Sequence, residues 1–369
     1  MPSKHKGNVW TILPISKGYL SGHLVFVFVT STLQLTYGQC IGGTVSFEKI
    51  AGTTLREAVQ TPLYSIAPSA READNPVTAE CTNRCRASPD CPAFLINYDR
   101  RACFALNIIS EGRRESLMSS PDKANYFEKI CLKASGCERA WAFERVVGKE
   151  LLGFDDRVIG DIPNKLECQE LCLQERVFPC RSGEYDYTLQ QCRLSTEDRR
   201  SQPSSFRPAI GDVDYFENQC VDNTGGPGQC QYEQKNDLDL QQPDLLRSAF
   251  SPEQCRALCD GTRAFICRSF TFQPSAARCW LSSDDVVSVG ARALVPRSEV
   301  FFYQRSNCLD LKLTCSSEAM KLTLKTLEPF DGRIFAKSAP HKCETYGNRR
   351  TSTIFELPLV SENCGGRKE

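Results

Sequence analysis

The sequence predicts a multidomain, disulfide-rich α+β protein, with three copies of one module followed by a shorter all-β unit. Three observations predict it: the chain has 21 cysteines in 369 residues, their spacing recurs three times, and long alternating segments replace the repeat after Cys308. Thiols in this number would be a liability in a reducing compartment. In an oxidising one they become cross-links that stabilise small domains with limited cores, so we expect a secreted, extracellular protein.

Residues 1–38 have the features of a signal peptide. Lysines precede an apolar stretch over residues 20–35, and small residues suit cleavage just before Gln39. An uncleaved membrane anchor or a buried helix is the alternative, but polar residues interrupt the stretch and it is short for a membrane span. No second hydrophobic run of spanning length follows, so we expect a membrane anchor only in a longer, single-pass form.

Charge and histidine content limit the function classes. Lys+Arg and Asp+Glu both number 45, so the formal net charge is zero and nothing favours nucleic acid or an anionic membrane as a partner. Of the three histidines, only His341 lies beyond the signal region, and the chain has no protease serine motif and no glycine-rich phosphate loop. We therefore expect no enzymatic activity and no cofactor.

Six cysteines recur in each of three segments, residues 40–131, 137–220 and 230–308. The last five of each set are spaced C-x3-C-x5-C-x11-C-x27-C, C-x3-C-x7-C-x11-C-x27-C and C-x3-C-x7-C-x11-C-x28-C. A similar tripeptide lies shortly before each closing cysteine, and its three versions are Tyr126-Phe127-Glu128, Tyr215-Phe216-Glu217 and Phe302-Tyr303-Gln304. Self-similarity of this kind indicates tandem copies of one structural unit.

A zinc site is the alternative to disulfides, because C-x3-C recurs. Structural zinc, however, is held by two closely spaced pairs of ligands, often with histidines nearby. The second pair here would be C-x11-C in an oxidising compartment. We therefore expect disulfides and no metal.

A predicted helix carries the C-x3-C pair of each copy. In the third copy residues 251–254 form a capping box with Pro252 at the first helical position, and Gly261 offers a left-handed end. Asn164 starts the corresponding helix of the second copy, and Thr78 caps that of the first. Because the two cysteines are four residues apart, they lie on one face of each helix.

Each helix is followed by a segment that alternates like a half-buried strand, as at Phe94 and Ile96 or at Phe270 and Phe272. A turn follows, at residues 99–101 in the first copy and 273–275 in the third. The next strand begins at a cysteine in each copy: Cys103, Cys192 and Cys279. The pattern predicts an antiparallel sheet crossed by one helix, with two bridges pinning the helix to the sheet.

These features resemble the PAN/apple module, and the resemblance covers residues 40 to 308 almost completely. In that family six cysteines pair first with sixth, second with fifth and third with fourth. The resemblance therefore implies the pairs Cys40–Cys131, Cys81–Cys103, Cys85–Cys91, Cys137–Cys220, Cys168–Cys192, Cys172–Cys180, Cys230–Cys308, Cys255–Cys279 and Cys259–Cys267. Sequence alone would leave 15 connectivities open for six cysteines.

Short linkers join the copies, with five residues between Cys131 and Cys137 and six between Cys308 and Cys315. Only residues 221–229, which include Gly-Gly-Pro-Gly, are long and flexible enough to act as a hinge. We expect a compact string of modules with one looser joint.

After Cys308 the pattern changes to long alternating strands with few turns. Met320, Leu322 and Leu324 alternate along one such strand. The Asp331-Gly332 pair predicts a hairpin turn that returns through residues 334–336, and a further strand runs through residues 354–357. We expect an all-β unit here.

Residues 312–369 are similar to the start of a zona pellucida (ZP) domain, its immunoglobulin-like N-terminal half, in the version found in invertebrate cuticle and apical-matrix proteins. The likeness is carried by residues 313–315, 329–337, 357–359, Cys343 and Cys364-Gly365. The resemblance implies a Cys343–Cys364 pair and leaves Cys315 unpaired, because its partner would lie beyond residue 369. Either the chain is a fragment or truncated isoform, or Cys315 is free or bonded to another chain.

Two surface features have competing interpretations. The arginine pairs at residues 113–114, 199–200 and 349–350 could bind an acidic polysaccharide, but nearby acidic residues favour solvated surface. The aromatic tripeptides could contact a ligand, but a core strand beside the outer disulfide is favoured.

PAN modules in tandem with a ZP domain resemble proteins that organise the apical extracellular matrix of moulting animals, beneath or within the cuticle. The resemblance implies a structural and adhesive matrix component, in which the PAN repeats bind matrix proteins or polysaccharides and a complete ZP domain polymerises with its own copies. The alternative is a soluble, secreted PAN-based binding protein, lectin-like or protease-associated, with a non-functional ZP remnant.

Overall fold

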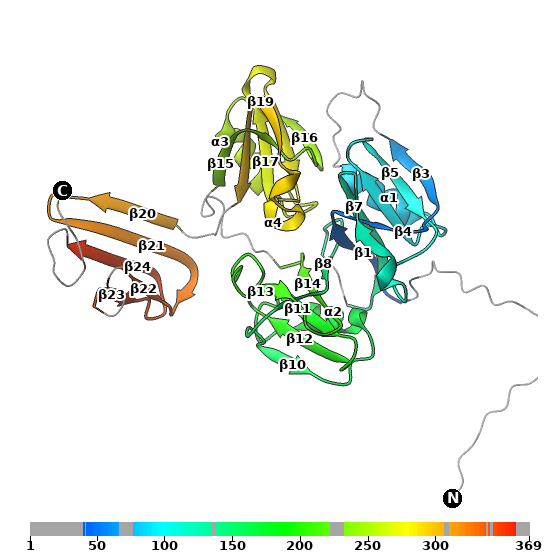
Figure 1. Ribbon diagram of the computed structural model, residues 1–369, viewed down its shortest axis with the longest axis horizontal. Coiled ribbons are helices and arrows are strands. Elements are labelled where there is room, and N and C mark those ends of the chain that lie inside the picture. Colours follow the sequence, from blue (N-terminus) through cyan, green and yellow to red (C-terminus); the bar gives the residue numbers. More distant parts are fainter. Residues whose placement is uncertain are drawn as a thin grey trace, which may run out of the picture. The chain divides into compact units, whose positions relative to one another are not determined.

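The computed structural model describes residues 40, 42–65, 77–134, 137–221, 232–305, 310–336, 339 and 342–358 (Figure 1). We call residues 40–131, 137–220 and 230–308 repeats 1, 2 and 3, and residues 310–358 the C-terminal unit. The expected signal peptide, nearly all of the expected hinge, and Cys364 lie outside the described residues. Within the described part, no helix is both long and apolar enough to cross a membrane.

Each repeat forms a five-stranded sheet with the same strand order. The order is β1-β7-β4-β5-β3 in repeat 1, β8-β14-β11-β12-β10 in repeat 2 and β15-β19-β17-β18-β16 in repeat 3. In every repeat the first and last strands pair with each other, and the strand that follows the long helix pairs with the last strand. Strand-rich modules with one long helix are therefore found in three copies (Figure 1).

The bounds of the elements follow the chain. Repeat 1 contains β1 (Thr44–Ala51), β2 (Thr53–Leu55), β3 (Gln60–Ser65), α1 (Val77–Ala87), β4 (Ala93–Asn97), β5 (Ala102–Leu106), η1 (Arg114–Ser116), β6 (Leu117–Ser119) and β7 (Ala124–Leu132). Repeat 2 contains β8 (Phe143–Val147), β9 (Lys149–Leu151), β10 (Arg157–Ile159), α2 (Lys165–Gln174), β11 (Ser182–Asp186), β12 (Gln191–Ser195), β13 (Phe206–Pro208) and β14 (Val213–Asn218). Repeat 3 contains β15 (Tyr232–Asp239), β16 (Leu245–Ser248), α3 (Pro252–Asp260), β17 (Ser269–Gln273), η2 (Pro274–Ala276), β18 (Arg278–Ser282), α4 (Val286–Val289), η3 (Ala291–Ala293) and β19 (Val295–Arg305).

Two of the three predicted helix caps are confirmed. The side chain of Asn164 accepts a hydrogen bond from the N–H of Glu167 at the start of α2, and Ser251 accepts one from Gln254 at the start of α3. The prediction for Thr78 is wrong, because this residue lies inside α1 and its hydroxyl donates to a carboxylate of repeat 3. Gly261 ends α3 with φ −84°, so the expected left-handed end is wrong as well.

The strands after the helices are buried on both faces, rather than half-buried as the alternation predicted. Every residue of β4 is buried, with Phe94 and Ile96 in the apolar cluster that includes the cysteines of α1. Leu95 faces the other way, into a second cluster with Leu55 and Leu117 of the paired strands β2 and β6. The central sheet therefore lies between a helix and a short ribbon.

The sheets of repeats 1 and 2 join into one ten-stranded sheet. Strand β1 pairs in parallel with β8, with Glu48 opposite Phe143 and Lys49 opposite Glu144. The N–H of Ala142 extends this pairing by donating to the carbonyl of Phe47 at 2.9 Å. The first strands of the two repeats therefore meet edge to edge.

The repeats are not separate beads on a string. Trp141, just before β8, packs edge-on against Phe127 of repeat 1 and lies parallel to the ring of Phe265 of repeat 3. All three side chains are buried, and one apolar cluster includes residues of repeats 1 and 3. The expectation of a simple string of modules is wrong, because Trp141 of repeat 2 packs against aromatic side chains of both other repeats.

Eight disulfides have both cysteines in the described residues. They are Cys40–Cys131, Cys81–Cys103, Cys85–Cys91, Cys137–Cys220, Cys168–Cys192, Cys172–Cys180, Cys255–Cys279 and Cys259–Cys267. In each repeat one bridge joins the long helix to the fourth strand of the sheet, and a second closes the loop at the helix end. Cys230 and Cys308 lie outside the described residues.

The C-terminal unit is built of strands. It contains β20 (Asp310–Cys315), β21 (Ala319–Phe330), β22 (Arg333–Phe335), β23 (Glu344–Tyr346) and β24 (Arg350–Pro358). The sheet order is β20-β21-β24, and among the described residues of this unit β22 pairs only with β23. The predicted hairpin at Asp331-Gly332 is therefore wrong: the chain turns there, but β22 leaves β21 and pairs with the strand that follows it. Cys343 is disulfide-bonded and packs beside Phe355, while Cys315 is exposed and free.

Candidate functional site

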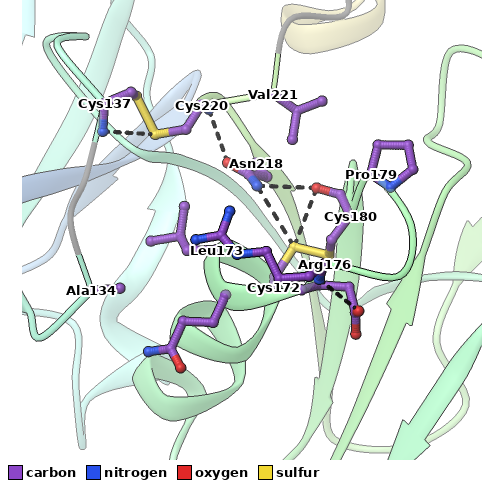
Figure 2. Close-up of a pocket in the computed structure, with 12 residues that line it drawn as sticks. Ala134, Cys137, Cys172, Leu173, Arg176, Pro179, Cys180, Asn218, Cys220 and Val221 are labelled. Carbon is purple, nitrogen blue, oxygen red and sulfur yellow. Dashed lines mark hydrogen bonds between the residues drawn. A yellow bond between two sulfur atoms is a disulfide. The ribbon is translucent and has the colours of Figure 1, made fainter.

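A pocket of about 490 Å³ lies in repeat 2, at the C-terminal end of α2 (Figure 2). The outer disulfide of the repeat forms one wall, and the loop from the helix to Cys180 forms another. The lining residues are Ala134, Cys137, Cys172, Leu173, Gln174, Glu175, Arg176, Pro179, Cys180, Asn218, Cys220 and Val221.

Asn218, the last residue of β14, holds these walls together. Its amide Nδ2 donates to the carbonyl of Cys180 at 3.0 Å, and its Oδ1 accepts from the N–H of Cys220 at 2.9 Å. Figure 2 shows the side chain between the outer disulfide and the loop disulfide. Both the donor and the acceptor of this buried amide are hydrogen-bonded, so Asn218 fixes the shape of the pocket. The polar groups at the pocket rim take no part in these bonds.

Glu175 sets the conformation of the loop at the rim. Its carboxylate accepts the N–H groups of Arg176 and Val177, both at 2.8 Å, and forms an ion pair with Arg157 at 2.8 Å. The hydrogen bond from Val177 and the contact with Arg157 hold the pKa of Glu175 below its usual value. The carboxylate is therefore engaged, and it does not act as a free base.

Arg176 is a charged lining residue of the pocket that has no ion-pair partner in the described part of the chain. Its guanidinium forms no hydrogen bond or ion pair with any residue in the described part of the chain. Leu173, Pro179 and Val221 supply apolar surface beside it. A planar donor next to apolar surface suits a carboxylate or sulfate group attached to a larger molecule. Binding, rather than bond-making chemistry, is what this arrangement supports, because the lining cysteines are bridged.

The sequence patterns did not single out Arg176. A signal was present, because Arg and Phe stand four and two residues before the fourth cysteine in both the second and third copies, as Arg176 and Phe178 and as Arg263 and Phe265. Only the structure separates the two copies: Phe265 is buried against Trp141, whereas Phe178 keeps part of its surface exposed.

The arginine pair at residues 199–200 was expected to be solvated surface, and this is wrong. Arg199 forms ion pairs with Glu144 and Glu217, and Arg200 forms them with Glu217 and Asp285 of repeat 3. Burial alone would disfavour the charge of Arg199, but these carboxylates outweigh it and raise its pKa. The pair connects repeats and is not available to a polysaccharide.

The other arginine pairs differ among themselves. Arg114 of repeat 1 forms ion pairs with Asp212 and Asp214 of repeat 2, whereas Arg113 is exposed. Arg349 is exposed and lies 3.5 Å from a carboxylate oxygen of Asp331. The expectation of solvated surface therefore holds for both residues of the pair at 349–350 and for Arg113.

The aromatic tripeptides of repeats 1 and 2 belong to the core. Tyr126, Phe127, Tyr215 and Phe216 are all completely buried, on β7 and β14. The interpretation as core strands is confirmed for these two copies, and it removes these residues from the candidate ligand contacts.

Two family models, both described as PAN domain, match the chain, one over residues 137–220 and 230–308 and the other over residues 69–104. Among solved structures, the two N-terminal apple domains of Toxoplasma gondii microneme protein 4 share 17% identity at a TM-score of 0.18, covering 49% of this chain and 93% of that one. Toxoplasma gondii sporozoite AMA1 shares 10% identity at a TM-score of 0.14, covering 50% of this chain and 63% of that one. No curated protein matches the sequence. The matches to the two family models show that this disulfide-rich chain carries tandem PAN domains.

Proposed function

We propose that the protein is a secreted, non-enzymatic component of an apical extracellular matrix or cuticle, in which the PAN repeats bind matrix protein or polysaccharide. PAN domains are typically binding modules for protein or carbohydrate. Disulfides in this number are typical of extracellular proteins. The only histidine beyond the expected signal peptide is His341. Histidine is the most frequent general acid or base in enzymes, so the sequence gives little support to an enzymatic function.

The observation that carries the proposal is the linking of the three repeats by buried charges. Arg145 of repeat 2 contacts Glu48 of repeat 1, and Arg268 of repeat 3 contacts Glu144 and Glu217 of repeat 2. Modules held in this way keep their binding surfaces at fixed distances and orientations from one another. Several weak contacts can then act together, which an adhesive protein needs.

We assign residues 312–369 in this proposal to the N-terminal half of a ZP domain. The antiparallel strands β20, β21 and β24 and the bonded Cys343 support the assignment. In a longer form with a complete ZP domain, strand edges such as that of β20 would be templates for strand addition between copies. Polymerisation would then arrange the PAN repeats along a filament.

The second candidate is a soluble PAN-based binding protein, and the pocket of repeat 2 favours it. The guanidinium of Arg176 could hold an acidic group of a single ligand without any polymer. The two candidates differ in what the C-terminal unit does, not in what the pocket binds.

Binding of secreted full-length chain to immobilised hyaluronan, with neutral chitin oligomers as a second probe, tests the proposal. We expect retention on the uronate polymer, and a loss of about tenfold or more in affinity for Arg176→Gln, because a charge-assisted hydrogen bond is removed. Arg113→Gln is the matched control, since its exposed side chain also has no partner in the described residues. Equal binding by the two variants would contradict the assigned role of Arg176, and no retention on either probe would contradict polysaccharide binding.

Polymerisation is tested separately, by sedimentation of a longer form with a complete ZP domain. Filaments would favour the matrix component. A monomer at all concentrations would favour the soluble binder.

A further inference from the structure

The loop between Cys259 and Cys267 of repeat 3 binds a short segment of repeat 2. The carbonyl of Ala264 accepts the N–H of Ala140 at 2.8 Å. The ring of Phe265 lies parallel to that of Trp141, with 6.2 Å between centroids and 8° between planes. Both aromatic side chains are 1% exposed. The loop therefore uses one backbone acceptor and one ring to hold a backbone donor and the aromatic side chain that follows it.

Repeat 2 contains a loop of the same form between Cys172 and Cys180. Seven residues separate the cysteines in both loops, and Phe178 stands at the position of Phe265. Repeat 1 has only five residues between Cys85 and Cys91, with no aromatic residue among them. The binding form of the loop is thus shared by repeats 2 and 3 alone.

In repeat 2 this loop is formed but holds no segment of the described chain. Val177 stands at the position of Ala264 and is 88% exposed, and within the described residues nothing donates to its carbonyl. Phe178 packs with one side on the core of repeat 2. The carboxylate of Glu175 fixes the backbone by accepting the N–H groups of Arg176 and Val177.

We propose that the loop at residues 175–180 is a docking site for a short peptide segment of a partner protein that carries a large aromatic side chain. The Val177 carbonyl accepts the N–H of the residue before the aromatic one, and the aromatic ring lies on Phe178. The partner's segment takes the place that Ala140 and Trp141 occupy on repeat 3. The proposal goes beyond polysaccharide binding at the Arg176 pocket and does not depend on it.

The internal complex on repeat 3 also indicates the strength to expect. Trp141 is enclosed on a second side by Phe127, at 5.6 Å and 71°, which the repeat 2 loop does not supply. A partner's aromatic residue would be covered on one face only, so a single site binds weakly.

The test uses an end-blocked, fluorescently labelled peptide with the sequence of residues 138–142, Glu-Arg-Ala-Trp-Ala, added to the secreted full-length chain. We expect saturable binding by fluorescence anisotropy. Replacing Trp by Ala in the peptide lowers the affinity about tenfold or more, because an aromatic anchor is lost. Methylating the backbone nitrogen of the Ala before Trp lowers it as well, because the donor to the Val177 carbonyl is removed.

Protein variants locate the site. Val177→Asp places a charge on an exposed position and leaves the fold intact, and Phe178→Leu removes the ring while keeping apolar volume. Both lower the affinity for the peptide about tenfold or more. Leu189→Asp, at a 64% exposed position of the same repeat, is the matched control and binds the peptide as the wild type does. Absence of saturable binding overturns the proposal. So does unchanged binding to Val177→Asp, which would place the peptide elsewhere, for example on the loop of repeat 3.

Discussion

Lys49 Nζ lies 2.7 Å from Asp284 Oδ1, and neither side chain is accessible to solvent. The pair joins β1 of repeat 1 to a loop of repeat 3, across a sequence separation of 235 residues. Asn125 donates to the other carboxylate oxygen at 2.6 Å, and Ser283 accepts from the ammonium at 2.8 Å. Burial raises the pKa of Asp284 even though Lys49 opposes this. A buried pair of this kind specifies which surfaces meet, because a wrong arrangement would leave both charges unpaired.

Removal of the ammonium in Lys49→Met is expected to destabilise the joined repeats by about 3–5 kcal/mol, because the Asp284 carboxylate is left buried without its cation. Differential scanning calorimetry of the secreted chain measures the effect as a lower Tm. The control is Arg84→Met, which breaks the exposed pair with Glu80 and is expected to cost less than about 1 kcal/mol.

A second change separates loss of charge from loss of packing. In Lys49→Met combined with Asp284→Asn, no charge remains uncompensated, so most of the lost Tm is expected to return. Equal effects of Lys49→Met and Arg84→Met would contradict the role given to the pair.

Glu184 of β11 gives the stability a pH dependence near neutrality. Desolvation raises the pKa of its carboxyl to about 7, in spite of an ion pair with Arg193 at 2.5 Å. The folded chain therefore holds this proton more tightly than the unfolded chain does. Stability from this group is present below the unfolded value near 4.5 and is lost as the pH rises towards 7.

Glu184→Gln keeps an oxygen that can accept from the N–H of Leu151 but cannot ionise. We expect the variant to match the wild type in stability at pH 4.5. At pH 8 we expect it to be more stable, by a free energy of unfolding on the order of 1–3 kcal/mol. Thermal melts at the two pH values check this. A variant that is less stable at pH 8 would show that the Arg193 pair outweighs desolvation.

Local sequence patterns predicted local structure well and contacts between repeats poorly. Asn164 and Ser251 cap their helices as expected, because a cap depends on neighbours within three residues. Threonine is a common helix-capping residue, but the hydroxyl of Thr78 donates to Asp244 of repeat 3, and no local pattern indicates this contact. Arg199 looks like surface for the same reason: its carboxylate partners are distant in sequence.

The pocket could not be predicted for a related reason. Arg176 differs from an arginine such as Arg113 in lining a pocket without an ion-pair partner, and the pocket is a property of the folded chain. The recurrence of Arg and Phe before the fourth cysteine was visible in the sequence. Which of the two loops is occupied was not visible, because this depends on the packing of repeat 3 against Trp141.

The outer disulfide of repeat 2 is expected to matter more than the loop disulfide. Cys137–Cys220 spans a sequence separation of 83 residues and Cys172–Cys180 spans 8, so the chain-entropy model gives losses of about 4–5 and about 2–3 kcal/mol. We compare the variant with serine at both outer positions with the variant with serine at both loop positions. The outer variant should have the lower Tm, and it should also lose hyaluronan binding because one pocket wall opens. The reverse order of Tm would show that packing around the loop bridge, not loop closure, dominates.

Cys315 at the end of β20 is expected to react as a thiol in the secreted chain. It is free and exposed, whereas Cys343 is disulfide-bonded and buried beside Phe355. Iodoacetamide applied without a reductant should therefore label Cys315 and leave Cys343 unlabelled, because only an accessible thiolate reacts. Peptide mapping by mass spectrometry under non-reducing conditions reads both sites and, under the ZP assignment, finds Cys343 joined to Cys364. An unlabelled Cys315 in a peptide linked to its own copy would contradict the free thiol and make this form a covalent dimer. A Cys343 bonded to a cysteine of the repeats would instead remove the ZP assignment, since no closed C-terminal unit would then exist.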